Sequence, residues 1–134
     1  MRRTGLLNTD LLRVISTAGH GQTVVIADAG LPMPAGVHCI DLAVVPGLPS
    51  FLDVAEAVLA ELVVESAVVA DELPVRNPAV AAGIRALLQV RGIVEVGSVP
   101  HVQFKQLSAA ALAIVRTGES TPFANVILTA GVPF

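Results

Sequence analysis

Hydrophobic positions along the chain change between a helical period and the continuous apolar runs of buried strands. Asn8-Thr9-Asp10 offers capping residues before the first helically spaced apolar set, and Gly19 follows that set. Thr23-Val24-Val25-Ile26 is β-branched throughout, which is typical of a buried strand. These patterns predict helices over about 9–18, 51–62 and 78–90, a short helix from 100, and strands over about 22–27, 37–42, 63–70, 93–99, 111–115 and 126–129. The alternation favours an α/β layered fold with a central sheet flanked by helices, and it leaves room for antiparallel pairs.

The helix predicted over 51–62 has the clearest signals. Ser50 stands at its capping position, and Asp53 follows three residues later in a box-like relation. Pro78 and Gly92 mark the start and the end of the next long helix in the same way. The inner face of the 51–62 helix is expected to carry Phe51, Val54, Ala55, Val58, Leu59 and Leu62.

The composition is unusually apolar, with 54% hydrophobic residues, 14% charged residues and a mean hydropathy of +0.76. The longest apolar stretch, Ala109 to Val115, has seven residues, whereas a helix that spans a membrane needs about 20. We therefore expect no membrane association. Soluble domains average about 25% charged residues, so this chain has too few to cover a monomer without exposed apolar patches. The sequence predicts a homo-oligomer.

Length, cysteine content and charge exclude further classes. The 134 residues are expected to form one domain over 1–134. Cys39 has no second cysteine with which to form a disulfide or a zinc knuckle. The net charge is -3 and the eight Lys and Arg are scattered, which argues against a nucleic-acid partner. Met1-Arg2-Arg3-Thr4-Gly5 is not followed by the apolar core of a signal peptide, so a cytoplasmic location is expected.

His20 and Asp28 are the first candidates for chemistry. His20 lies between Gly19 and Gly21, which leave its imidazole accessible, and histidine titrates near neutral pH as a general acid or base should. The alternative is a histidine that interacts with the last carbonyl groups of the preceding helix. Asp28 follows the next strand, at the carboxyl end where open α/β sheets usually bind ligands. Alternatively, Asp28 fixes its own loop by a local hydrogen bond.

The other two histidines carry weaker signals. His101 follows Pro100 at a helix start, where a surface or capping role would also explain it. His38 alternates with its neighbours in a strand-like run, and the burial predicted from that pattern favours a structural role. A metal site from His20, His101 and Asp28 is chemically possible, but no HxH or HxxxH spacing preorganises two ligands, so no metal is expected.

Motifs for other chemistries are absent. Gly19-His20-Gly21 precedes a strand, whereas a dinucleotide fingerprint follows one, and the chain has neither a P-loop nor a GxSxG elbow. Cys39 lies in an apolar strand pattern with no basic neighbour except His38, which gives little support to nucleophilic catalysis. Asp71-Glu72 is interpreted as a solvated strand end and Glu119 as a turn residue.

The segment from Arg116 to Asn125 is the most polar irregular stretch and precedes a strongly apolar strand. One interpretation is an ordinary solvated turn. The other is a binding loop, in which backbone groups and the Asn125 amide meet a polar ligand such as a sugar, since an amide can both donate and accept hydrogen bonds.

Several motifs in a common order resemble the RbsD/FucU sugar mutarotase family, and the resemblance covers nearly the whole chain. The Asp-Ala-Gly-Leu-Pro loop is more similar to the ribose branch than to the fucose branch, whose loop typically reads Asp-Ala-Asn-Phe-Pro. The motifs are Gly5-Leu6-Leu7-Asn8, Gly19-His20-Gly21, Asp28-Ala29-Gly30-Leu31-Pro32, Asp41-Leu42-Ala43, Gly47-Leu48-Pro49-Ser50-Phe51, His101-Val102-Gln103-Phe104-Lys105, Arg116-Thr117-Gly118-Glu119 through Pro122-Phe123-Ala124-Asn125, and the ending Ala130-Gly131-Val132.

The resemblance implies an enzyme that interconverts the β-pyranose and β-furanose forms of D-ribose, without metal or organic cofactor. It also implies a ring-shaped homo-oligomer, a decamer built from two pentamers. The family usually has Tyr where this chain has Phe123. If the family's sugar contact there is made by backbone, the change matters little; if the hydroxyl makes it, sugar affinity or specificity is affected. By resemblance, the catalytic histidine falls on His20 and the substrate-binding positions fall on Asp28, His101, Phe123, Ala124 and Asn125.

The residue types agree with such chemistry. Opening a cyclic hemiacetal requires a proton for the ring oxygen and removal of one from the anomeric hydroxyl, and His20 could supply the first as imidazolium. Asp28, His101 and Asn125 would hold the other hydroxyls. Two alternatives stay open at this point: a mutarotase for another sugar such as L-fucose, and a non-catalytic sugar-binding oligomer. A site within one subunit and a site shared between subunits both agree with the sequence.

Overall fold

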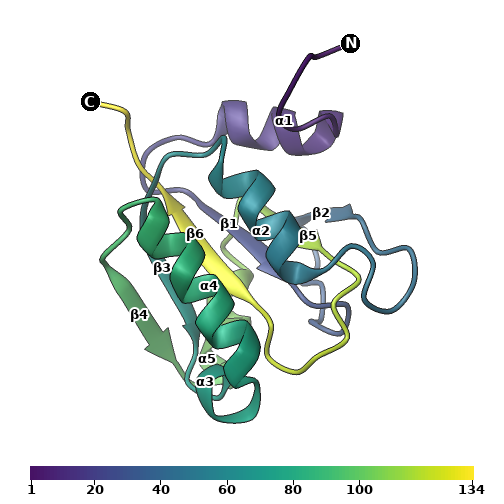
Figure 1. Cartoon of the computed structure of the whole chain (residues 1–134), viewed down its shortest axis with the longest axis vertical. Coiled ribbons are helices and arrows are strands. Elements are labelled where there is room, and N and C mark those ends of the chain that lie inside the picture. The colour runs from purple at the N-terminus through teal and green to yellow at the C-terminus, as the bar shows by residue number, and fades with distance from the viewer.

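A mixed six-stranded sheet in the order β2-β5-β1-β6-β3-β4 forms the centre of the computed structural model, which describes all residues 1–134 (Figure 1). β1 and β2 both run parallel to β5, and β3 runs parallel to β4. β6 lies between β1 and β3 and runs antiparallel to both. The strands are β1 Thr23–Ala27, β2 His38–Asp41, β3 Val64–Ala70, β4 Val96–Val99, β5 Ala113–Arg116 and β6 Val126–Ala130.

Helices cover the two faces of the sheet unequally. Residues of α1, α2 and α4 pack with the sheet into the larger apolar cluster, whereas α5 contributes Phe104 to a smaller cluster on the opposite face. Figure 1 shows α2 and α4 in front of the sheet and α5 behind it. The helices are α1 Thr9–Thr17, α2 Phe51–Leu59, α3 Leu73–Arg76, α4 Pro78–Val90 and α5 His101–Ser108.

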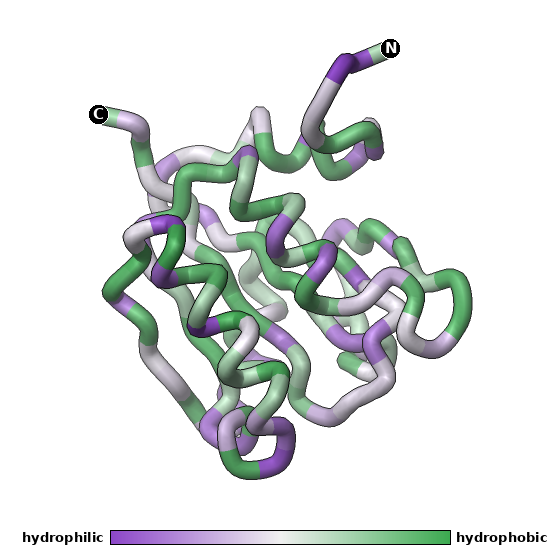
Figure 2. Tube along the Cα trace, viewed as in Figure 1, coloured by the Kyte–Doolittle hydropathy of each residue, from purple (hydrophilic) through white to green (hydrophobic).

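β1 shows how the sheet separates these two cores. Val24 and Ile26 belong to the larger cluster, and Val25 and Ala27 to the smaller one, because successive side chains of a strand point to opposite faces. All four are buried, which explains a continuous apolar run where a half-exposed strand would alternate. Figure 2 shows hydrophobic colour along the central strands, polar colour at intervals along the helices, and a largely hydrophobic loop after β2.

The structure confirms the predicted α/β class and most of the predicted elements. The Asn8 side chain caps α1 by accepting from the Leu11 N–H (3.0 Å). Ser50 caps α2 by accepting from the Asp53 N–H (3.1 Å). All six residues predicted for the inner face of the 51–62 helix are buried. No helix combines the length and the apolar character needed to cross a membrane.

Several details differ from the predictions. Helix α2 ends at Leu59, not at residue 62. The short helix α3 was not predicted, and β4 begins at Val96, not at residue 93. The buried role expected for His38 is wrong, because both His38 and Cys39 are exposed. Their strand, β2, pairs only with β5 and forms one edge of the sheet. Strand order is not encoded in the local sequence pattern, so this edge position was not predicted.

Candidate functional site

Asp28 and Asn125 face each other at one end of the sheet, where β1 ends and β6 begins. The Asp28 N–H donates to the Asn125 side-chain oxygen (2.8 Å), and the Asn125 amide nitrogen donates to Asp28 Oδ2 (3.0 Å). Asn125 is completely buried. This reciprocal pair fixes the orientation of the Asp28 carboxylate, so the Asn125 side chain acts as a support for Asp28 within the chain.

Asp28 also organises its own loop. Its Oδ1 accepts from the Gly30 N–H (2.9 Å), which is the local hydrogen bond weighed as the alternative to a functional role. The two roles are compatible, because a carboxylate has about four lone-pair directions and these contacts use two. The carboxylate borders a hollow of about 280 Å³, which is lined by Asp28, Ala29, Gly30, Glu119, Ser120, Thr121 and Pro122.

Buried polar groups brace the segment that carries Asn125. Glu119 Oε1 accepts from the Phe51 N–H (3.0 Å) at the start of α2, and its Oε2 accepts from the Thr121 hydroxyl (2.9 Å). The Asn77 amide donates to the same hydroxyl (2.8 Å) and to the Pro122 carbonyl (2.9 Å). Glu119 is buried, which disagrees with the interpretation of this segment as an ordinary solvated turn. These hydrogen bonds tie the segment to the start of α2 and to Asn77, and they fix its backbone conformation.

Phe123 occupies an unusual backbone conformation in this loop. Its φ of 59° lies in the left-handed region, which bulky side chains rarely adopt and which costs about 1–3 kcal/mol. The Phe123 ring meets His101 edge-on, with 5.0 Å between ring centroids and 82° between planes. Phe123 is partly exposed, whereas Ala124 and Asn125 are fully buried. Of these three predicted sugar contacts, Phe123 is therefore the one that a single chain presents to solvent.

His101 begins α5 and lies beside Phe123. The backbone N–H of His101 donates to both carboxylate oxygens of Glu72 (3.2 and 3.0 Å). The Glu72 carboxylate therefore lies at the positive end of the α5 dipole. The imidazole Nδ1 is buried and has no hydrogen-bond partner. Buried polar atoms are nearly always paired, so the missing partner of this nitrogen makes it a candidate for a contact from outside the chain. Glu72 was interpreted as part of a solvated strand end, and its contact with His101 corrects that.

His20 lies at the other end of the sheet. The extended backbone from Gln22 to Asp28 advances about 20 Å, and His20 precedes it. The His20 Nε2 lies 2.8 Å from Glu65 Oε2 at the start of β3. Within one chain the structure therefore brings Asp28, His101 and the 123–125 segment together and leaves His20 apart. No three His, Cys, Asp or Glu side chains are grouped as metal ligands.

Edge strand β2 is tied to the Asp28 loop through Arg116. Its guanidinium donates to both carboxylate oxygens of Asp41 (3.1 Å each) and to the Ala29 carbonyl (3.0 Å). The Ala43 N–H and the Arg116 guanidinium hold the pKa of Asp41 below its ordinary value. Partial burial and the Asp41 charge raise the pKa of the Cys39 thiol. A raised pKa disfavours the thiolate, so it adds no support for nucleophilic catalysis by Cys39.

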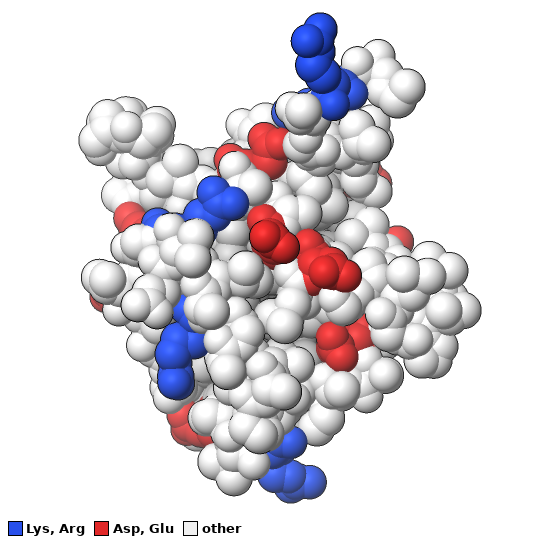
Figure 3. All heavy atoms as spheres, viewed as in Figure 1, with Lys and Arg blue, Asp and Glu red and all other residues white.

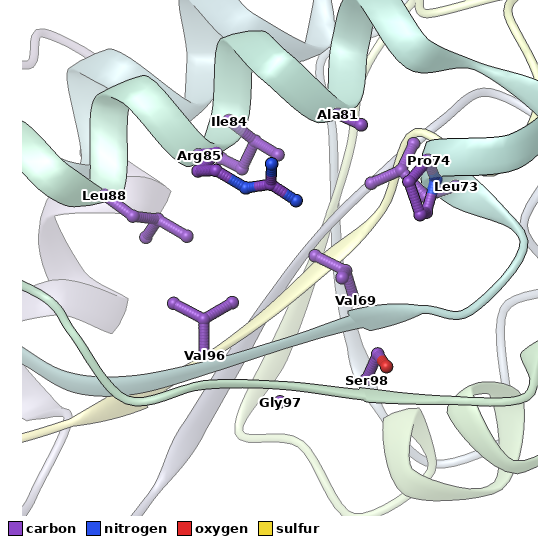
Figure 4. Close-up of a pocket in the computed structure, with 10 residues that line it drawn as sticks. All are labelled: Val69, Leu73, Pro74, Ala81, Ile84, Arg85, Leu88, Val96, Gly97 and Ser98. Carbon is purple, nitrogen blue, oxygen red and sulfur yellow. The ribbon is translucent and has the colours of Figure 1, made fainter.

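A separate cavity of about 190 Å³ lies between α4 and strands β3 and β4. Figure 4 shows its mostly apolar lining, with the Arg85 guanidinium directed into the space below α4. It shares no residue with the Asp28 or His20 groups. Its lining lacks a carboxylate or an imidazole, so it offers no acid or base.

The polar groups around Asp28 and His101 offer hydrogen-bond donors and acceptors of the kind that suit an uncharged polar ligand. Comparisons with known proteins identify the family of the chain. Residues 1–133 match the sequence profile of the RbsD / FucU transport protein family. The chain is 57% identical to the D-ribose pyranase of Symbiobacterium thermophilum and 52% identical to that of Laribacter hongkongensis, in each case over 134 residues that cover both chains completely. The chain therefore belongs to the RbsD/FucU family.

Solved structures agree with this assignment. The fold matches Bacillus subtilis RbsD complexed with D-ribose, with a TM-score of 0.94, 42% identity and complete coverage of both chains. It also matches the fucose mutarotase of Streptococcus pneumoniae in complex with L-fucose, with a TM-score of 0.82, 25% identity and coverage of 95% of this chain and 94% of that one. The fold is thus shared by proteins that were solved with two different sugars.

Sequence reasoning missed Glu65, Glu72 and Asn77, which contact site residues from distant parts of the chain. Each is an ordinary acidic or amide residue in the sequence, with no motif around it. Only the pairing of β3 with its neighbours and the return of the 117–125 loop bring them to the site. The numbering gap between His20 and Glu65 is 45 residues, so no local pattern could have indicated the contact.

Proposed function

We propose that this protein is a cofactor-independent isomerase that interconverts the β-pyranose and β-furanose forms of D-ribose. The observation that carries the proposal is the full-length similarity to D-ribose pyranases together with the 0.94 TM-score to the ribose-bound RbsD. The Asp28 loop sequence agrees with the ribose branch. Two alternative functions, a mutarotase for L-fucose and a non-catalytic sugar-binding oligomer, give different results from D-ribose isomerisation in exchange and binding assays.

The chemistry needs one proton donor and a set of groups that hold hydroxyls. The His20 imidazolium donates a proton to the ring oxygen while the bond from that oxygen to the anomeric carbon breaks. The anomeric hydroxyl loses its proton to water, and the aldehyde forms. After rotation, the 4-hydroxyl attacks the aldehyde carbon to give furanose, or the 5-hydroxyl attacks it to give pyranose. In either closure the attacking hydroxyl gives its proton to the neutral imidazole, and the carbonyl oxygen takes a proton from water. General acid-base assistance of this kind is worth about 10² to 10⁴-fold.

Asp28 and His101 hold the sugar in this proposal. The Asp28 carboxylate is oriented by Asn125 and borders the hollow beside it, so it can accept from a sugar hydroxyl. The unpaired Nδ1 of His101 can bind a second hydroxyl. The edge-on Phe123 ring supports His101 and presents an apolar surface to the sugar carbons. An uncharged polyol is suitably held by several such bonds and no ion pair.

A complete site then requires two copies of the chain. His20 and Asp28 flank opposite ends of β1, and one sugar cannot reach both within a chain. A neighbouring copy that places its His20 beside this chain's Asp28 brings the two groups within reach of one sugar. Homo-oligomerisation also accounts for the scarcity of charge: Figure 3 shows charged atoms in small scattered groups on a largely uncharged face. Exposed apolar side chains include Val44, Val45, Leu48, Val90, Val94 and Val102. We propose the decamer of two pentamers implied by the resemblance, in the cytoplasm.

The decisive test is NMR saturation transfer on D-ribose with and without the protein. We expect faster exchange between pyranose and furanose signals, and loss of the acceleration in His20→Ala. L-fucose under the same conditions ranks the alternative substrate. Binding of ribose without faster exchange would favour the non-catalytic reading. Sedimentation or light scattering that gave a stable monomer at micromolar concentration would contradict the oligomer.

Mixed oligomers test the shared site. His20→Ala and Asp28→Asn are each expected to be inactive, but co-refolding the two should restore part of the exchange activity, because some interfaces then combine an intact His20 with an intact Asp28. A mixture that stays inactive, although mass spectrometry shows mixed oligomers, would place both residues in one chain's site and overturn the two-copy arrangement.

A further inference from the structure

Glu65 lies at an irregularity in the pairing of β3 with β6. In the pairing of β3 with β6, Val64 is opposite Ala130 and Ser66 is opposite Thr129. Two steps along β3 therefore match one step along β6, and Glu65 is the extra residue of a β-bulge. Bulges of this kind redirect a side chain away from the alternation of the strand and are common next to active sites.

The bulge directs Glu65 toward His20. The carboxylate Oε2 lies 2.8 Å from His20 Nε2, although the two residues belong to different elements. Gly131 follows β6 directly opposite the bulge, and a Cβ added there would lie 3.2 Å from the Glu65 Cβ. The glycine therefore lets β6 pass close to the bulged residue, and a larger residue would push the bulge and its side chain aside.

The contact also fixes which imidazole nitrogen is free. The contact with Glu65 is the one hydrogen bond of the His20 side chain, which is 60% exposed, and the Glu65 side chain is 45% exposed. With Nε2 held by the carboxylate, Nδ1 points away from Glu65 and is open to a ligand. A carboxylate that binds one ring nitrogen sets the tautomer and the orientation of a catalytic histidine.

We infer that Glu65 is the positioning residue of the proton donor: it holds His20 through Nε2, so that Nδ1 is the nitrogen that gives its proton to the sugar ring oxygen. The inference rests on the proposed function of His20. The contact restricts rotation of the imidazole ring about the Cβ–Cγ bond and so keeps Nδ1 directed away from Glu65. In this assignment Glu65 acts through His20 and does not bind the sugar, so its contribution belongs to the chemical step.

Three variants test this assignment in the assembled protein. Glu65→Gln keeps an acceptor oxygen and the size of the side chain but removes the charge. Glu65→Ala removes both. Glu56→Gln is the matched control, because Glu56 is an exposed residue of α2 and loses the same charge away from His20. Steady-state exchange rates over a range of ribose concentrations separate kcat from KM for each protein.

We expect kcat to fall about tenfold in Glu65→Ala, since removing the acid itself costs about 10²-fold or more and misorienting it forfeits part of that. Glu65→Gln should lie between Glu65→Ala and wild type. KM should stay unchanged in both, and Glu56→Gln should behave as wild type. A wild-type kcat in Glu65→Ala, with His20→Ala inactive, would overturn the inference and leave the proposed function standing. A wild-type protein without exchange activity would instead refute the proposed function.

Nitrogen-15 NMR of the His20 ring gives a readout independent of turnover. In the wild type, the neutral ring should carry its proton on Nε2, which donates to Glu65, and Nδ1 should report the lone pair. Glu65→Ala should show a mixture of tautomers, and Glu65→Gln, whose amide can donate as well as accept a hydrogen bond, should also hold less of the Nε2–H form than the wild type. A neutral wild-type ring protonated on Nδ1 would contradict the assignment of the donor nitrogen. Circular dichroism and the oligomer mass confirm that each variant is folded and assembled.

Discussion

The Asp28–Asn125 pair predicts an unusual response to the nearly isosteric change Asn125→Asp. The Asn125 amide donates to Asp28 Oδ2 at 3.0 Å and its oxygen accepts from the Asp28 N–H at 2.8 Å. The substitution keeps the acceptor but replaces the donor by a second carboxylate oxygen. A hydrogen bond to a charged group contributes about 1.5–3 kcal/mol to stability, and two carboxylates at this separation repel each other. We expect a destabilisation of about 3 kcal/mol near neutral pH.

The sign of the pH dependence follows from proton binding. Two adjacent carboxylates in the folded variant share a proton that the unfolded chain does not hold until the pH is lower. Stability therefore rises as the pH falls, and part of the loss should be recovered between about pH 7 and pH 5. Asn125→Ala is the matched control, because it loses both hydrogen bonds, for about 2–3 kcal/mol, but introduces no charge and should show no such recovery.

Urea unfolding at several pH values, at one fixed protein concentration, measures these differences; the concentration is fixed because dissociation contributes to the stability of an oligomer. Wild-type stability of Asn125→Asp near neutral pH would refute the orientation assigned to the Asn125 amide. A loss that stays constant on acidification would refute the shared proton. Either result would remove the structural basis for an oriented Asp28 carboxylate.

Three further predictions concern other parts of the structure. Gly118→Ala should destabilise the protein by about 3 kcal/mol in urea unfolding, because the added Cβ would overlap the backbone carbonyl of Leu48. Gly97→Ala is the control and should stay near wild type, since the nearest atom to its added Cβ is a side-chain atom at 4.0 Å. Equal stabilities of the two variants would refute the close approach at Gly118. Asp41→Asn should lower thermal stability near neutral pH. The deficit should disappear as the pH falls through the folded-state pKa of Asp41, because a carboxylate with a lowered pKa stabilises the fold only while it is ionised. A deficit that grows on acidification would contradict this. Phe123→Tyr keeps the ring edge-on to the histidine beside it, so ribose KM should not change; a lower KM would show that the missing hydroxyl contributes to binding.

Local sequence signals predicted the helices well because their causes are local. The caps at Asn8 and Ser50 act within three residues of the chain, and the spacing of apolar residues in α2 identified its buried face without knowledge of its partners. The short helix α3 escaped because four residues do not complete a periodic pattern.

Features that depend on strand order were not predictable in this way. The exposure of His38 and Cys39 follows from the edge position of β2, which is set by pairing with β5, about 75 residues further along the chain. The contact of Glu65 with His20 depends on a bulge that exists only relative to β6. The candidate residues themselves came from the family resemblance more than from periodicity, and the separation of His20 from Asp28 became visible only in three dimensions.

The length of β1 has a consequence for when the protein becomes active. With His20 before this strand and Asp28 after it, each folded chain holds two half-sites and no complete one on the proposed function. Folding alone then yields no catalyst, and activity begins when chains meet. At protein concentrations below the dissociation constant of the assembly, the rate should rise more steeply than the amount of protein, and dilution should stop turnover without unfolding a single chain.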